Sequence, residues 1–355
     1  MKKRLGFLLR LSITFLIIFY IINYMIVFDD IVYLDNGKSV RGNISHITSS
    51  TCFINIHGNK QQIPFAQIDL TKGIEYGFYS VVSNLDLTIY FLFCLFLFCN
   101  ILLTSWRILL ILKPQNITLS YWQMTKINFI STFFGNFLPG FTGGDALKIY
   151  YLAKKSSLVL KPLALVLFDR VIGLMALILV ATTVTIFQIH TPVVKSFAPF
   201  IFTLFGGVVF GCLVLFFLPL QFLQRKHSLL DQIIEIIFVF RQKPIVFFQA
   251  AAISILVHCS TNISVYGFAQ ALHIDLPIYI FFVFVPISFI VMMLPISLAG
   301  WGVGEATYSY LFSYVGIAKT KAVTLSVLTK FGQMLVGIIG AMIWIVDKDI
   351  RHKKD

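Results

Sequence analysis

The chain has 355 residues, of which 58% are hydrophobic, 15% aromatic and only 12% charged, and its net charge is +13. A soluble domain usually carries about 25% charged residues, and several apolar runs here exceed the roughly 20 residues that span a bilayer as a helix. The composition excludes a soluble globular protein and predicts an all-α polytopic membrane protein. The five cysteines show no metal-ligand spacing, and we expect no metal and no cofactor.

The positive charge is distributed unevenly along the chain. If the helices alternate from a cytoplasmic N-terminus, nineteen Lys and Arg residues, including Arg107, face the cytoplasm, and seven lie outside. Arg170 and Lys330 fall within membrane segments. This positive-inside pattern predicts a multi-pass protein of the cell (inner) membrane with cytoplasmic N- and C-termini. Because topology accounts for the charge, we expect no nucleic-acid partner.

The first apolar run follows a basic head and continues to residue 27, which is too long for the apolar region of a cleaved signal peptide. We expect residues 1–27 to be a transmembrane anchor. Residues 28–83 then contain short segments rich in Val, Ile, Thr and Phe, separated by the turn-forming sequences Asp35-Asn36-Gly37 and His57-Gly58-Asn59. We predict four strands, at 32–34, 39–47, 51–56 and 61–68, in a small extracytoplasmic SH3-like or Sm-like β module.

Residues 84–112 are predicted to return inward. The next apolar run, 127–147, is flanked by basic residues, Lys126 before it and Lys148 after it, and a full crossing would place one cluster outside. A hairpin that enters and leaves on the same side removes this conflict. Gly135, Pro139 and the glycines before Asp145 support it, since an interior proline costs about 3 kcal/mol and a glycine about 1 kcal/mol. We predict a re-entrant segment whose broken backbone is buried in protein.

The remaining segments repeat this organisation. Residues 162–189, 199–220 and 244–270 are predicted to cross the membrane, with an amphipathic surface stretch at 221–243. A second broken run, 278–315, contains two prolines and a glycine-rich segment that ends at Glu305. Residues 322–346 then run inward, and 347–355 form a basic cytoplasmic tail. The prediction is about six transmembrane helices plus two re-entrant hairpins, with a transmembrane domain at 84–346.

The two broken runs echo each other. Gly144-Asp145 is followed by Tyr150, and Gly304-Glu305 is followed by Tyr310 at the same offset. If one hairpin opens from each face, the two halves form an inverted repeat. In transporters this arrangement places the substrate at the repeat interface, near the membrane midplane.

Ionisable side chains inside a membrane cost about 2.5–3.5 kcal/mol each on insertion scales, so they are functional candidates by default. Asp145 and Glu305 each stand where a helix begins, and either could cap orphan amides there or bind an amine, a hydroxyl or a proton. The amides of Gly143 and Gly144 with the helix dipole could form an anion site. Lys148 shares a helix face with Asp145 and could neutralise a phosphate.

Asp169 and Arg170 are adjacent, so they point apart on a helix and each needs its own partner. A structural ion-pair network and a phosphate site both remain open for them. Lys330 could pair with Glu305 or Asp169, or contact a headgroup. The predicted substrate-binding residues are Asn136, Gly143, Gly144, Asp145, Lys148, Asp169, Arg170, Gly300, Gly304, Glu305 and Lys330.

Three sequence blocks carry a family resemblance: Asn136-Phe137-Leu138-Pro139-Gly140, Asp169-Arg170-Val171-Ile172-Gly173-Leu174 and Gly300-Trp301-Gly302-Val303-Gly304-Glu305. With the residues around them, they resemble the flippase-like family, the transmembrane region of lysylphosphatidylglycerol synthases and their stand-alone relatives. The family pattern favours Arg where Lys148 stands and Glu where Asp169 stands, and both changes keep the charge. The resemblance covers roughly residues 84–346 and implies binding or movement of lipids with phosphate headgroups. Because the sequence ends about ten residues after its last predicted helix, we expect no aminoacyl-transferase domain.

The leading prediction is a lipid flippase or transporter for a phospholipid or a polyprenyl phosphate, with membrane lipids as partners and no catalytic residues. One alternative is a membrane transferase that uses lipid-linked substrates, with Asp29 and Asp30 in the first outer loop as its candidate residues. Another is a non-transporting accessory protein, in which the β module binds a partner protein or a second copy of the chain.

Overall fold

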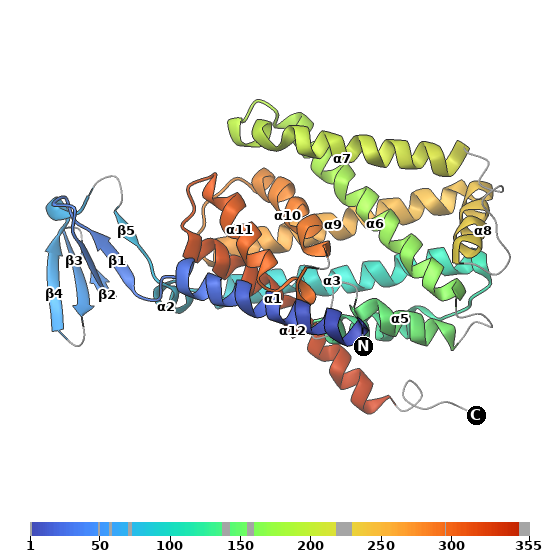
Figure 1. Cartoon of the computed structure of the whole chain (residues 1–355), viewed down its shortest axis with the longest axis horizontal. Helices are drawn as coiled ribbons and strands as arrows, with labels where there is room; N and C mark the ends of the chain where they lie inside the picture. The colour runs from blue at the N-terminus through green and yellow to red at the C-terminus, as the bar shows by residue number, and fades with distance from the viewer. Residues whose placement is uncertain are drawn as a thin grey trace.

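The computed structural model describes residues 2–48, 50–56, 59–69, 73–136, 143–154, 160–217, 229–294 and 296–347. This part of the chain is mostly helical, and a small β sheet lies at one end of an elongated helical bundle (Figure 1). The helices are α1 (Lys2–Tyr24), α2 (Phe78–Ser83), α3 (Leu87–Leu112), α4 (Tyr121–Gly135), α5 (Gly143–Ala153), α6 (Leu160–Phe187), α7 (Pro192–Phe217), α8 (Leu229–Gln242), α9 (Pro244–Ala271), α10 (Ile278–Met293), α11 (Val303–Ser313) and α12 (Lys319–Val346).

Five helices are long and apolar enough to cross a membrane, at Leu87–Gln115, Leu160–Phe187, Pro192–Val214, Pro244–Ala271 and Lys319–Val346. They correspond to five of the six predicted transmembrane helices, so the prediction of a polytopic membrane protein is confirmed. The sixth prediction concerned α1, whose stretch Thr14–Tyr24 is a shorter apolar helix. The count of six therefore stays a prediction.

The β sheet follows α1. Its strands are β1 (Asp30–Tyr33), β2 (Ser39–Ile47), β3 (Thr51–Ile56), β4 (Asn59–Pro64) and β5 (Ile74–Glu75), antiparallel in the order β4-β3-β2-β1-β5. The predicted strands at 39–47 and 51–56 match β2 and β3. The fourth predicted strand ends early, at Pro64, where the chain enters a 3-10 turn (Phe65–Gln67). The two-residue β5 was not predicted, and the SH3-like or Sm-like assignment stays a prediction.

The predicted turn at Asp35-Asn36-Gly37 is confirmed. Gly37 has a φ of +78° and donates its N–H to the Leu34 carbonyl oxygen at 3.0 Å, a left-handed conformation that glycine adopts at little cost. The second predicted turn falls largely on residues 57–58, which lie outside the described residues, as do 137–142, 221–228 and the tail from 348.

The side chain of Asp30 links the β sheet to the helices through hydrogen bonds. Its side chain is fully buried, and its Oδ1 accepts a hydrogen bond from the Gly77 N–H at 2.7 Å. Its Oδ2 accepts from the Ile44 N–H and from the Ser80 hydroxyl, both at 2.7 Å. One carboxylate therefore joins β1, β2 and α2, which argues for a structural role in place of the catalytic one considered for the outer loop. The neighbouring Asp29 is exposed.

Two pairs of short helices interrupt the bundle. They are α4 with α5, of 15 and 11 residues, and α10 with α11, of 16 and 11 residues. At 1.5 Å per residue these helices measure about 17–24 Å, less than the roughly 30 Å of a bilayer's hydrocarbon core. The described residues thus agree with two hairpins where the sequence predicted them. Their re-entrant character is not tested by these lengths.

Two segments of the bundle have a similar order of long and short helices, α3–α6 and α9–α12, and we call them its two halves. Helices α3 and α9, which open the halves, pack along each other. Helix α4 of the first hairpin packs against α12, and α10 of the second hairpin packs against α6. Each hairpin therefore lies against the last long helix of the other half, as expected of a repeat. Helix α7 lies at the outer edge of the bundle (Figure 1).

Helix α8 covers one end of this bundle, packed against α6 and α9. It buries Ile234, Ile236, Ile237 and Phe240, so the described part of the amphipathic stretch, Leu229–Gln242, places an apolar face against the other helices. Leu230 is exposed.

Candidate functional site

The first hairpin places a buried acid between two bases. Asp145 lies in the first turn of α5, and its Oδ2 accepts a hydrogen bond from Arg170 Nε at 2.7 Å. Lys148 Nζ lies 3.7 Å from Oδ1 of the same carboxylate. Gly144 makes this position possible, because a Cβ there would collide with the backbone carbonyl oxygen of Ser131 on α4. The close contact of the two helices thus fixes where Asp145 sits.

Asp169 has a different partner. Arg107 of α3 donates two parallel hydrogen bonds to it, Nε to Oδ1 at 2.7 Å and Nη2 to Oδ2 at 2.9 Å, and a third from Nη1 to Ser254 Oγ at 3.0 Å. The prediction that Asp169 and Arg170 need separate partners is confirmed. The prediction that Arg107 faces the cytoplasm is wrong, because its side chain is buried within the bundle.

These five side chains do not balance in charge. Three cations meet two carboxylates, so the cluster carries one positive charge in excess. Lys148 makes the longest contact of the cluster's three ion pairs, at 3.7 Å, which leaves it the least neutralised cation. We call this group the charged cluster; its members are Arg107, Asp145, Lys148, Asp169 and Arg170.

The second hairpin carries a neutral pair. Lys330 Nζ lies 2.8 and 3.1 Å from the two carboxylate oxygens of Glu305 and donates to the Gly300 carbonyl oxygen at 2.9 Å. Its ammonium group also lies 4.4 Å from the centre of the Trp301 ring. Glu305 accepts a hydrogen bond from the Gly302 N–H at 2.7 Å, so it caps α11 and pairs with Lys330 at once. Of the partners predicted for Lys330, the structure selects Glu305.

The two acid–base pairs have the same spacing. Asp145 and Arg170 are 25 residues apart, and so are Glu305 and Lys330. In both halves the acid lies in the first turn of the hairpin's second helix, and the base lies on the long helix that follows. The sequence showed matching residues within the two hairpins, and the equal acid–base spacing extends this match to the basic residues that pair with them.

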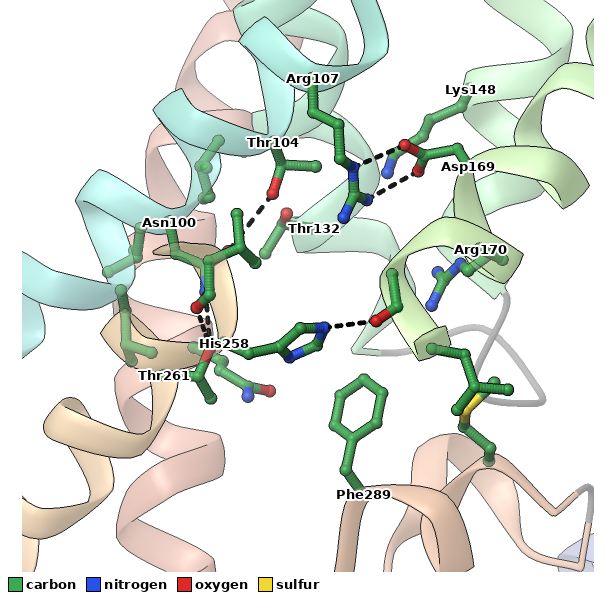
Figure 2. Close-up of a pocket in the computed structure, with 18 residues that line it drawn as sticks. Asn100, Thr104, Arg107, Thr132, Lys148, Asp169, Arg170, His258, Thr261 and Phe289 are labelled. Carbon is green, nitrogen blue, oxygen red and sulfur yellow. Dashed lines mark hydrogen bonds and ion pairs between the residues drawn. The ribbon is translucent and has the colours of Figure 1, made fainter. Parts of the chain in front are cut away.

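Three cavities border the two pairs. The first, of about 240 Å³, reaches Arg107, Lys148, Asp169 and Arg170 of the charged cluster (Figure 2). A second, of about 170 Å³, borders Asp145, and a third, of about 50 Å³, borders Lys330. Gln333 lines all three, so the three cavities are neighbours around this side chain.

The predicted residues divide into two groups around this space. Asn136 lines the second and third cavities, and Gly144 lines the second. Gly143 begins α5, and Gly304 leaves room for Lys330, whose Nζ would lie 3.3 Å from a Cβ at that position. Gly300 contributes its carbonyl oxygen to Lys330.

Several polar residues that line the first cavity were not predicted. Together with Ser254, which binds Arg107 but does not line the cavity, they form two stripes with the same spacing of four and three positions, Asn100, Thr104 and Arg107 on α3 and Ser254, His258 and Thr261 on α9. Residues at this spacing share one helix face. A polar stripe on an otherwise apolar helix is a signal that could have found them.

A family model described as the lysylphosphatidylglycerol synthase TM region matches residues 77–340. The chain belongs to this family. The match confirms the resemblance found in the sequence blocks and covers every residue of the charged cluster. The β sheet lies before the family region. No curated protein and no solved structure matches the chain.

Proposed function

We propose that this chain binds the phosphate headgroup of a membrane lipid in the cavity beside the charged cluster and moves that lipid across the membrane. The observation that carries the proposal is the single positive charge in excess at a cavity inside an apolar bundle. An unneutralised charge at such a depth costs several kcal/mol. A phosphodiester carries one negative charge and would neutralise it.

The cations also have the geometry for this ligand. Arg170 and Lys148 line both the first and the second cavity. A planar guanidinium matches two phosphate oxygens, and an ammonium group adds a mobile point charge. Arg107 is held by Asp169 and Ser254, so its part is to fix the wall of the cavity.

The repeat suggests how the lipid would move. The first acid–base pair borders two cavities, of about 240 and 170 Å³, whereas the second borders one of about 50 Å³, where Lys330 is held by Glu305 and the Gly300 carbonyl oxygen. In an inverted repeat the two halves exchange such states as the bundle rocks. The proposal therefore includes two re-entrant hairpins, one from each face, cytoplasmic termini and an extracytoplasmic β sheet.

Purified protein in vesicles tests this function. Fluorescent anionic phospholipids and polyprenyl phosphates should cross the bilayer faster than in protein-free vesicles, measured by quenching of the outer leaflet. Loss of a charge-assisted hydrogen bond costs about 1.5–3 kcal/mol, so Lys148→Gln should slow movement at least about ten-fold.

Lys126→Gln is the matched control for this experiment. Lys126 pairs with Asp347 at 2.8 Å, but its side chain is 45% exposed, so its loss should leave the rate nearly unchanged. Wild-type protein that moves none of these lipids above the protein-free rate would contradict the proposed function.

A further inference from the structure

The first cavity, of about 240 Å³, has a second, uncharged wall. Asn100 and Thr104 of α3 and His258 and Thr261 of α9 form it, and Figure 2 shows them beside Arg107, Lys148, Asp169 and Arg170. We call these four residues the neutral wall. The hydrogen bonds within the wall decide which ligand groups it can accept.

The hydrogen-bond donors of Asn100, Thr104 and Thr261 already form hydrogen bonds within the protein. Asn100 donates its two amide hydrogens to the Val257 carbonyl oxygen at 3.1 Å and to Thr261 Oγ1 at 2.6 Å. The Thr261 hydroxyl donates to the Val257 carbonyl oxygen at 3.0 Å, and the Thr104 hydroxyl donates to Asn100 Oδ1 at 3.4 Å. An amide oxygen has two lone pairs, so Asn100 Oδ1 can accept one more hydrogen bond.

His258 completes this arrangement. Its Nε2 lies 2.8 Å from the Gly173 carbonyl oxygen, which can only accept, so Nε2 carries the hydrogen. Arg107 lies against the same glycine, with Nη1 3.3 Å from the position of a Cβ at Gly173, so a second proton on the ring would add charge beside a guanidinium. The imidazole is therefore neutral, and its Nδ1 carries a lone pair.

His258 is 8% exposed and lines the first cavity, and its Nδ1 makes no hydrogen bond with the described residues. A ligand donor in the cavity can therefore bind this lone pair without displacing a protein partner. The neutral wall thus offers acceptors at His258 and Asn100, while its own donors are occupied.

We propose that the neutral wall selects phosphate headgroups that carry a hydroxyl donor, which His258 Nδ1 and Asn100 Oδ1 accept. This selectivity rests on the proposed function, because the charged cluster must hold the phosphate. An ammonium group would also donate, but the phosphate already neutralises the charged cluster, and a further cation would restore an unneutralised charge inside the apolar bundle. The wall therefore favours an uncharged polyol headgroup.

A matched pair of lipids tests the selectivity on the unmodified protein. Phosphatidylglycerol and phosphatidylpropanol have the same charge and the same three-carbon headgroup, and only the first has hydroxyl groups. One or two hydrogen bonds are worth about ten-fold, so binding and movement of phosphatidylglycerol should exceed those of phosphatidylpropanol by roughly that factor. Equal binding and movement of the two lipids would overturn the proposal.

Substitutions of His258 test whether the neutral wall causes the selectivity for phosphatidylglycerol. His258→Phe keeps a ring but removes the acceptor, and should make the two lipids nearly equal. His258→Gln can donate to Gly173 and accept from the ligand, and should keep most of the preference. His190→Phe, at an exposed histidine between α6 and α7, should keep all of it.

Thr261→Val covers the case in which His258→Phe does not fold. It keeps the shape of the side chain but removes the acceptor of one Asn100 amide hydrogen, which then faces the cavity as a free donor. The preference for phosphatidylglycerol over phosphatidylpropanol should therefore fall. If Thr261→Val, or a folded His258→Phe, keeps the full preference for phosphatidylglycerol over phosphatidylpropanol, the neutral wall is not the source of the selectivity.

Two further readouts separate the sources of ligand and the two proposals. Soluble glycerol phosphate that competes with the lipid would identify a free phosphate ester as a ligand, and a lack of competition would identify the lipid; either supports the hydroxyl selectivity. If neither lipid moves or binds, the proposed function fails. If both move equally, the function stands and the selectivity fails.

Discussion

Arg107 binds Asp169 through two parallel hydrogen bonds, with Nε 2.7 Å from Oδ1 and Nη2 2.9 Å from Oδ2, and this leaves Arg170, the next residue, to bind Asp145. The two adjacent residues of α6 therefore link that helix to α3 on one side and to the first hairpin on the other. The Arg107–Asp169 pair is the more deeply buried of the two, with side-chain exposures of 8% and 6%.

We expect Asp169→Asn to destabilise the protein by about 3–5 kcal/mol, because it leaves the Arg107 guanidinium buried without a countercharge. Thermal unfolding in detergent, followed by the loss of the monodisperse peak, measures this change. Glu235→Gln is the control, since the Lys161–Glu235 pair is longer, at 3.4 Å, and Glu235 is 51% exposed. Replacing both buried partners, as Arg107→Met with Asp169→Leu, should recover part of the lost stability. If Asp169→Asn unfolds no sooner than Glu235→Gln, the pair is not a structural anchor.

Gly340→Ala should also destabilise the bundle. A Cβ at Gly340 would collide with the backbone carbonyl oxygen of Phe129, so α12 and α4 would have to move apart. Overpacking of this kind costs about 1–3 kcal/mol. Gly207→Ala on α7 is the matched control, because a Cβ there meets nothing within 4 Å. The same detergent unfolding assay compares them, and equal behaviour of the two variants would refute the close contact.

Asp30→Asn should loosen the sheet from the helices. The amide nitrogen cannot accept the hydrogen bonds that the carboxylate receives from Ile44, Gly77 and Ser80. Hydrogen bonds to a charged group are worth about 1.5–3 kcal/mol, so limited proteolysis should cut between the sheet and α2 sooner than in wild type. The exposed Asp29 gives the control, Asp29→Asn, which should be cut at the wild-type rate.

The thiol of Cys52 offers a pH-dependent test of the same sheet. Burial raises the pKa of Cys52, and the nearby charge of Asp30 raises it further. The folded thiol therefore keeps its proton to higher pH than the unfolded one. This contribution to stability is complete below the unfolded pKa, about 8.5, and is lost as the pH rises through the folded pKa.

We expect slow maleimide labelling of folded Cys52 at pH 8 and fast labelling after denaturation, in a variant whose other four cysteines are serine. Mass spectrometry measures both rates. Equal rates in the folded and unfolded protein would show that the thiol is not enclosed as the structure places it.

The sequence predicted those features that a local pattern determines. The glycine and proline breaks located both hairpins, and alternating β-branched residues located β2 and β3. The pairing of Lys330 with Glu305 was among the predicted alternatives, since an unpaired base at that depth is costly.

Features that depend on distant partners were missed. Arg107 lies five positions before the end of α3, about 7.5 Å along the helix axis, which reads as a side chain that reaches the membrane surface. Only its pairing with Asp169 on α6 shows that Arg107 is an interior residue. His258, alone in an apolar run, reads as a core residue until α3 and α6 are placed beside it. The two-residue β5 exists only because β1 offers it an edge.

Each hairpin packs against the last long helix of the other half, and this arrangement has a mechanical consequence. Helix α12 carries Lys330, the base of the second hairpin, yet it packs against α4 of the first. Helix α6 carries Arg170, the base of the first hairpin, yet it packs against α10 of the second. Neither hairpin can shift without pressing on the helix that holds the other's ion pair. We therefore expect a displacement of either hairpin to reach the ion pair of the other through α12 or α6.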